Sequence, residues 1–142
     1  MRTDEHYMTH LSNAIAILLM FCEEMDSAIR ICAEENLHKI IRANENQFSV
    51  RIQYDLYHEI RKNGHERSLR ICLNLFAHYM HLIKQRKAKP YALNLVPCVF
   101  TISKRKETLL IETLCEFLKV FGKYLQLCLS ENEVLKLIEV SF

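Results

Sequence analysis

Apolar residues recur every three or four positions along most of this chain, and three blocks of them begin about forty residues apart. The blocks contain the tetrapeptides IRIC at 29–32, LRIC at 69–72 and LLIE at 109–112. This spacing is typical of helices that bury one stripe of side chains. Polar stretches separate the blocks at 23–27, 43–47, 61–68, 85–90, 103–108 and 130–132. The pattern predicts helix pairs that repeat with a period of about forty residues, within the range of HEAT or armadillo units.

The same pattern gives the expected bounds of each helix. They are 5–23, 27–43, 47–62, 66–84, 89–102, 107–127 and 131–142. Asp26 suits the N-terminus of the second helix, and Ser130 with Glu133 three residues later matches a capping box for the last. Gly64 suits the left-handed residue that ends a helix. Pro97 falls inside a helical pattern and should kink or interrupt it.

The expected architecture is all-α, an α-solenoid of HEAT-type helix pairs in a single array. The pairs fall at about 1–43, 44–86 and 87–129, and residues 130–142 form the first helix of a truncated fourth pair. Only 2 Gly and 2 Pro occur, and half the residues are hydrophobic, which favours helices joined by short turns. A length of 142 residues suits one domain.

Composition and charge limit the partners and the cellular compartment that we expect. A net charge of +2 with 25% charged residues gives no reason to expect nucleic acid as a partner. The six cysteines lie among apolar helical residues without a CxxC pair, which favours free thiols in a reducing compartment. The apolar run at 14–22 is too short to span a bilayer, and Asp4 and Glu5 precede it where a signal peptide carries positive charge. We therefore expect a cytosolic or nuclear protein.

The sequence carries no motif that indicates catalysis. It has no GxSxG, no Gly-rich phosphate loop and no HExxH. The pairs His6 with His10 and His78 with His81 have spacings that place two imidazoles on one helical face, but two ligands do not make a zinc site. We expect no catalytic residue, no metal site and no cofactor, and therefore not an enzyme.

Two arginines follow an acidic residue by four positions, at equivalent points of the first two repeats. These are Arg30 after Asp26 and Arg70 after Glu66, a favourable order on one helical face. In HEAT units such residues hydrogen-bond along the stack, so Asp26, Arg30, Glu66 and Arg70 are the predicted inter-repeat ladder. The alternative is a set of solvated surface ion pairs that contribute little.

Basic residues concentrate in two of the expected turns between paired helices. They are Arg61, Lys62, Arg67, Lys104, Arg105 and Lys106. In a solenoid such turns line up along one edge, about 10 Å apart. This basic strip is a candidate contact for an acidic partner segment or for anionic lipid headgroups, which would make peripheral membrane contact. The alternative is ordinary soluble loop residues.

Residues 56–114 resemble the first HEAT repeats of the huntingtin family. The resemblance rests on LYHEIRKNG at 56–64, KPYALNLVPC at 89–98 and TISKRKE at 101–107, and it extends more weakly to about residue 25 and through residue 137. Vertebrate members of the family begin with a short amphipathic helix, a glutamine tract and a proline-rich segment, and residues 1–24 match them poorly. The resemblance therefore indicates an invertebrate or non-polyglutamine version, or a fragment that starts at a different point.

This resemblance implies a non-catalytic scaffold in vesicle transport and autophagy. It implies a huntingtin-associated helical partner, motor and vesicle adaptors, and the rest of the same solenoid C-terminal to Phe142. It also implies a cytoplasmic location, with nuclear and vesicle-associated pools. The alternative is a stand-alone helical adaptor or import-type carrier for peptide segments. The absence of Trp, and Asn74 and Asn94 at unmatched repeat positions, count against a carrier.

Overall fold

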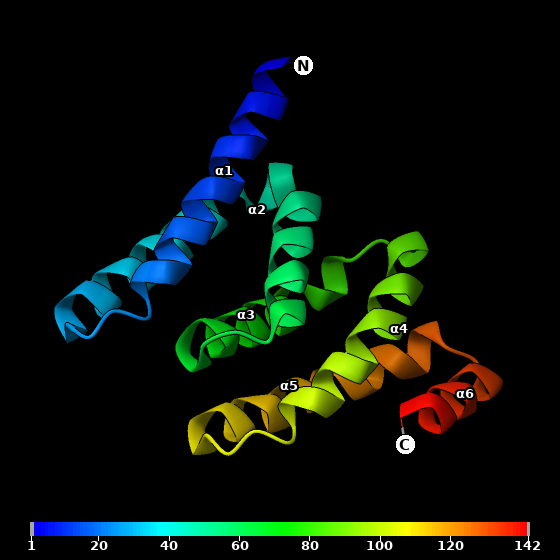
Figure 1. Ribbon diagram of the computed structural model, residues 1–142. Helices are drawn as coiled ribbons and strands as arrows, with labels where there is room; N and C mark the ends of the chain where they lie inside the picture. Colours follow the sequence, from blue (N-terminus) through cyan, green and yellow to red (C-terminus); the bar gives the residue numbers. More distant parts are fainter. Residues whose placement is uncertain (1, 142) are drawn as a thin grey trace. The chain divides into compact units, whose positions relative to one another are not determined.

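The computed structural model describes residues 2–141, and all regular structure in that range is helical. The elements are α1 (Arg2–Phe21), α2 (Ser27–Lys62), α3 (Glu66–Tyr79), the 3-10 turn η1 (Met80–Leu82), α4 (Gln85–Ile102), α5 (Thr108–Cys128) and α6 (Glu131–Ser141) (Figure 1). This confirms the all-α class and most of the expected bounds. The expected end of the last helix, Phe142, lies outside the described residues. Within the described range, no helix is both long and apolar enough to cross a bilayer.

The chain divides into two compact units, residues 1–55 (the N-terminal unit) and residues 56–142 (the C-terminal unit). In the N-terminal unit, α1 lies along the first part of α2 (Figure 1). Its core includes Leu11, Ile15 and Leu19 of α1 with Leu37 and Ile41 of α2, each at most 4% exposed. The spacing of four residues keeps each set on one helical face, as the apolar pattern predicts.

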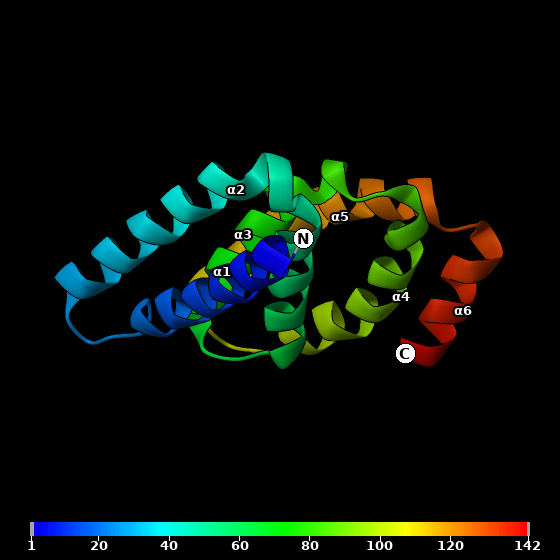
Figure 2. The ribbon, with the colours of Figure 1, turned by 90° about the horizontal axis from the view of Figure 1, so that it is seen from above.

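A break between two helices was expected at 43–47, and the structure places it one residue later, at Phe48. Residues 43–47 stay helical, and α2 instead bends at Phe48, whose φ of −120° and ψ of 26° leave the helical region (Figure 2). The stretch ANENQ contains neither Gly nor Pro, so nothing in it forces the chain out of the helix. The predicted second and third helices are therefore both present, and the kink at Phe48 separates them within α2.

The C-terminal unit is built from two layers of helices. α3 packs against α5, its equivalent in the next helix pair, and α4 packs against both α5 and α6 (Figure 1). Equivalent helices of successive pairs therefore stack on one another, which is the packing of a solenoid.

A series of aromatic rings runs through the interior of the C-terminal unit. Tyr57 of α2 lies 4.6 Å from Tyr91 of α4, between ring centroids, and Phe76 of α3 meets Tyr91 edge-on at 5.9 Å. Phe76 also lies 6.5 Å from Phe117 of α5, which is 5.2 Å from Phe121. All five residues are buried. The series therefore connects α2, α3, α4 and α5 through the interior of the unit.

Most of the predicted capping residues at the helix ends are confirmed, but one is not. Asp26 Oδ1 accepts the Ala28 N–H at 2.8 Å. Ser130 and Glu133 form the expected capping box, with the Glu133 N–H donating to Ser130 Oγ at 3.3 Å and the Ser130 N–H to Glu133 Oε1 at 3.2 Å. The left-handed residue after α2 is Asn63, with a φ of 49°, and not Gly64. Asn adopts this region more readily than other side chains because its short amide bonds locally.

Pro97 does not interrupt its helix. α4 continues through it to Ile102. Pro97 has no N–H for the carbonyl of Leu93, but both residues lie on the exposed side of α4, where solvent can hydrogen-bond that carbonyl. The lost hydrogen bond is therefore tolerated.

Candidate functional site

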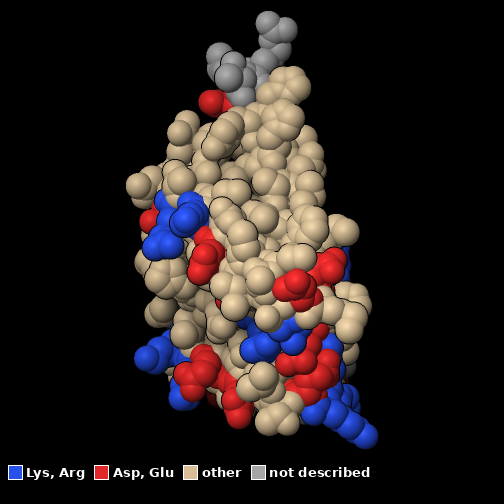
Figure 3. Space-filling view, turned by 90° about the vertical axis from the view of Figure 1, so that its left-hand side faces the viewer, with Lys and Arg blue, Asp and Glu red and all other residues tan. Residues whose placement is uncertain are grey.

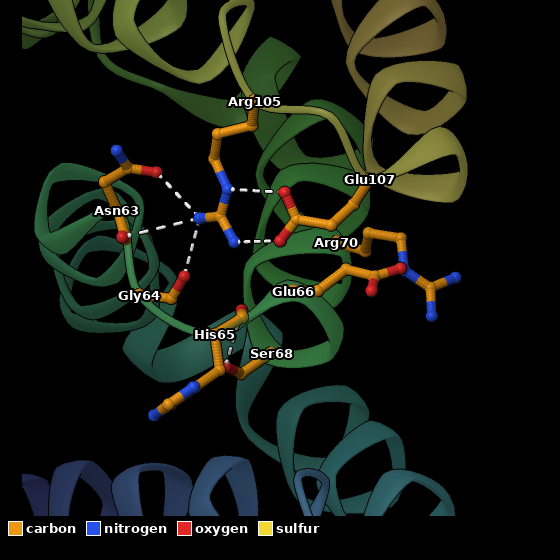
Figure 4. Close-up of polar contacts among 8 residues, drawn as sticks. All are labelled: Asn63, Gly64, His65, Glu66, Ser68, Arg70, Arg105 and Glu107. Atoms are coloured by element: carbon orange, nitrogen blue, oxygen red, sulfur yellow. Dashed lines mark hydrogen bonds and ion pairs between the residues drawn. The ribbon is translucent and has the colours of Figure 1, made fainter.

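Arg105 joins two successive turns of the C-terminal unit (Figure 4). It lies between α4 and α5, and its Nη1 donates to Asn63 Oδ1 at 2.9 Å, to the Gly64 carbonyl at 2.6 Å and, more weakly, to the Asn63 carbonyl at 3.4 Å. Asn63 and Gly64 form the turn between α2 and α3. One guanidinium therefore connects turns that are 42 residues apart in the sequence.

Glu107 fixes the orientation of the same guanidinium. Arg105 Nε donates to Glu107 Oε1 at 3.1 Å, and Nη2 donates to Glu107 Oε2, which makes a two-pronged pair. The Arg105 side chain is only 20% exposed. This hydrogen bonding from Arg105 is the main reason that the pKa of Glu107 lies below its ordinary value. We call Arg105, Glu107, Asn63 and Gly64 the turn clamp.

The turn clamp uses the electrostatics of a helix end. The last carbonyls of a helix have no partner within it and carry a partial negative charge. Asn63 and Gly64 directly follow the last residue of α2, so the Arg105 guanidinium bound to their carbonyls lies near this negative end. The left-handed conformation of Asn63 ends the helix and exposes these acceptors. A cation is stabilised there, and it stabilises the turn in return.

The first pair of predicted ladder residues acts within its own turn. Arg30 Nη1 donates to the carbonyls of Glu24 and Met25, both at 2.8 Å, and these residues follow α1. Asp26 caps α2. Arg30 thus binds carbonyls beyond a helix end, as Arg105 does, but in the turn that immediately precedes its own helix.

The second predicted pair lies on α3 (Figure 4). Arg70 Nε is 3.5 Å from Glu66 Oε1, an ion pair one helical turn apart. The distance and angle do not make it a hydrogen bond, and this buried nitrogen has no hydrogen-bond partner among the described residues. Both predicted pairs therefore make these contacts within their own turn or helix. The tie between turns is made instead by Arg105, which the sequence placed in the basic strip.

Other members of the basic strip contact side chains close to them in sequence. Arg61 Nη1 donates to the Tyr57 hydroxyl at 3.3 Å, with its guanidinium carbon 5.6 Å from the ring centroid. Lys62 pairs with Glu59 at 3.1 Å. Such contacts hold the aliphatic stems down and leave the charges partly screened.

The remaining residues of the basic strip differ in their contacts. Lys104 Nζ lies 4.6 Å from the centroid of the Phe100 ring, a cation–π contact. Arg67 is exposed and has a partner, and Lys106 is exposed. On the face drawn in Figure 3, Lys and Arg atoms border Asp and Glu atoms at several places. That face therefore mixes both signs of charge.

The residues considered for metal or thiol chemistry have ordinary surroundings. Over the described residues, no group of three or more His, Cys, Asp or Glu is placed to hold a metal ion. His6 and His10 stack, with ring centroids 5.8 Å apart. All six cysteines are free thiols. Burial is the main cause that raises the pKa of Cys22 to about 11, so its reactive thiolate is scarce near neutral pH.

Comparison with known proteins decides the family. Residues 18–142 match the family model described as Huntingtin, N-terminal HEAT 1. The chain belongs to the huntingtin family. Huntingtin of Takifugu rubripes is 40% identical over 114 residues, which cover 80% of the chain but 4% of that protein. The chain therefore spans a small part of its relative's length, and its stacked layers are the HEAT-type solenoid that the forty-residue period predicts.

Proposed function

We propose that this chain is a non-catalytic scaffold segment of a huntingtin-like protein, presenting a solenoid surface to protein partners in vesicle transport and autophagy. The match to the huntingtin N-terminal HEAT model is the observation that carries the proposal. The turn clamp and the aromatic series support it physically, because they hold successive helix pairs in one register. A fixed stack keeps its exposed surface ready for binding.

The proposed partners include further helices of the same solenoid, a huntingtin-associated helical protein, and motor and vesicle adaptors. Apolar side chains on α5 and α6 support the first of these. Leu118, Leu127, Leu135 and Ile138 are between 41% and 84% exposed. A solenoid repeat buries such residues against the next repeat. The proposed location is the cytoplasm, with nuclear and vesicle-associated pools.

An antibody raised to residues 56–114 tests this function on the natural protein. Immunoblotting of its own cells should show a band far larger than the 16.8 kDa of this chain. Immunopurification should retrieve motor and vesicle adaptors together with that band. A band near 16.8 kDa without these adaptors would instead support a stand-alone helical adaptor.

A further inference from the structure

A hollow of about 410 Å³ lies between α1 and α2 in the N-terminal unit. Leu11 and Ala14 line it from α1, and Ile40 and Ala43 line it from α2. Ala14 is half-buried and Ala43 is exposed, so the hollow is open to solvent and its small side chains leave space between the helices. The volume lies within the range of small-molecule sites in proteins.

Hydrogen bonds fix the side chains on one side of the hollow. The Tyr7 hydroxyl donates to Asn44 Oδ1 at 2.8 Å, and Asn44 Nδ2 donates to the Ile40 carbonyl at 2.7 Å. Asn44 is buried, so its amide is fixed on both sides. The space is therefore bounded by a defined wall.

The remaining polar groups of the lining favour an anion. His10 and Lys39 face the space from opposite helices, and no Asp or Glu lines it within the described part of the chain. Lys39 is exposed and makes no hydrogen bond or ion pair with another described residue. An ammonium and an imidazole N–H both donate to a carboxylate, while the apolar walls accept only a hydrocarbon.

We propose that this hollow binds a medium-chain carboxylate of about eight to twelve carbons. At about 30 Å³ for each water-sized group, the volume takes roughly a dozen such groups. The hydrocarbon lies against Leu11, Ala14, Ile40 and Ala43, and the carboxylate is bound by Lys39 and His10. This ligand goes beyond the scaffold function and does not depend on it.

Calorimetric titration of the 142-residue chain with decanoate, below its micelle concentration, tests the proposal. Decylammonium has the same hydrocarbon and the opposite charge, and it should bind at least about tenfold more weakly. Ala14→Leu adds three carbons at the apolar wall of the hollow and should weaken decanoate binding at least about tenfold. Ala16→Leu is the matched control, because Ala16 is exposed on the same helix and does not line the hollow.

A second pair of variants keeps the test valid if Ala14→Leu fails to fold. Lys39→Gln should weaken decanoate binding about three- to tenfold and leave decylammonium unchanged or tighter. Lys123→Gln, an exposed position on α5, should change neither. Absence of saturable decanoate binding, or equal affinity in the wild-type chain and a folded Ala14→Leu variant, would overturn the proposal. Equal affinities for decanoate and decylammonium would also overturn it.

Discussion

The two units bury different kinds of side chain. The buried polar residues, Asn44 and Gln53, lie in the N-terminal unit on either side of the bend at Phe48. Most of the buried aromatic residues instead lie in the C-terminal unit. These are Tyr57, Phe76, Tyr79, Tyr91, Phe117, Phe121 and Tyr124. Both units have apolar cores, but the N-terminal unit also buries two amides near its bend, and the C-terminal unit concentrates the large aromatic rings.

This difference has an energetic meaning. A buried amide needs its hydrogen bonds to offset desolvation, so it specifies geometry and adds little net stability. A buried aromatic ring contributes through the area that it removes from water. Equivalent substitutions should therefore cost more in the aromatic series than at the amides.

The largest effect is expected at the centre of the aromatic series. Phe117→Ala should lower the free energy of unfolding by about 3–5 kcal/mol, because it leaves a cavity between Phe76 and Phe121. Urea unfolding followed by circular dichroism measures this change. Leu118→Ala is the matched control, because Leu118 is the next residue of α5 and is 41% exposed. Equal losses for the two variants would refute the central role of the series.

The turn clamp should come second. Arg105→Ala should lower the free energy of unfolding by about 1–3 kcal/mol, because it leaves the Glu107 carboxylate and the Asn63 and Gly64 carbonyls without their donor. The same urea titration applies. Lys106→Ala, at the neighbouring exposed residue, should stay within about 0.5 kcal/mol of the wild type. If Arg105→Ala matched that control, the clamp would not stabilise the stack.

A smaller loss is expected in the N-terminal unit. Tyr7→Phe removes the hydroxyl that donates to Asn44 and should cost about 0.5–1 kcal/mol, since Tyr7 itself is 46% exposed. A double-mutant cycle with Asn44→Ala isolates the pair, and its coupling should have a similar size. Strictly additive losses would show that the hydrogen bond contributes nothing, and the contrast between the two units would then widen.

Local sequence signals predicted the helices well because their causes are local. Apolar residues at helical spacing mark buried faces, and Asp26, Ser130 and Glu133 cap as their chemistry requires. The break was predicted at 43–47 and lies at Phe48, since polar residues mark a solvated face as readily as a break. Gly64 was preferred over Asn63 only because Gly is the commoner left-handed residue.

Contacts between turns were not predictable in the same way. The role of Arg105 depends on the register in which α5 stacks on α3, and no spacing within one turn shows that register. The available signal was Glu107 two residues after Arg105, which offers the guanidinium a partner before any external ligand. The hollow beside Ala14 and Ala43 depends likewise on which faces of α1 and α2 meet.

The smallest expected effect is a pH dependence of stability that arises from Glu107 in the turn clamp. The pKa of Glu107 is lowered from its ordinary value of 4.5, chiefly by its hydrogen bonds from Arg105. Its contribution to stability is therefore complete above the unfolded pKa and is lost as pH falls through the folded pKa. Urea midpoints below pH 4.5 should fall more steeply for the wild type than for Glu107→Gln. In an Arg105→Ala background this difference should vanish, because the group that lowers the pKa is gone. If the difference persisted, another cation would be responsible, and the clamp would be only one of the contacts that hold this turn.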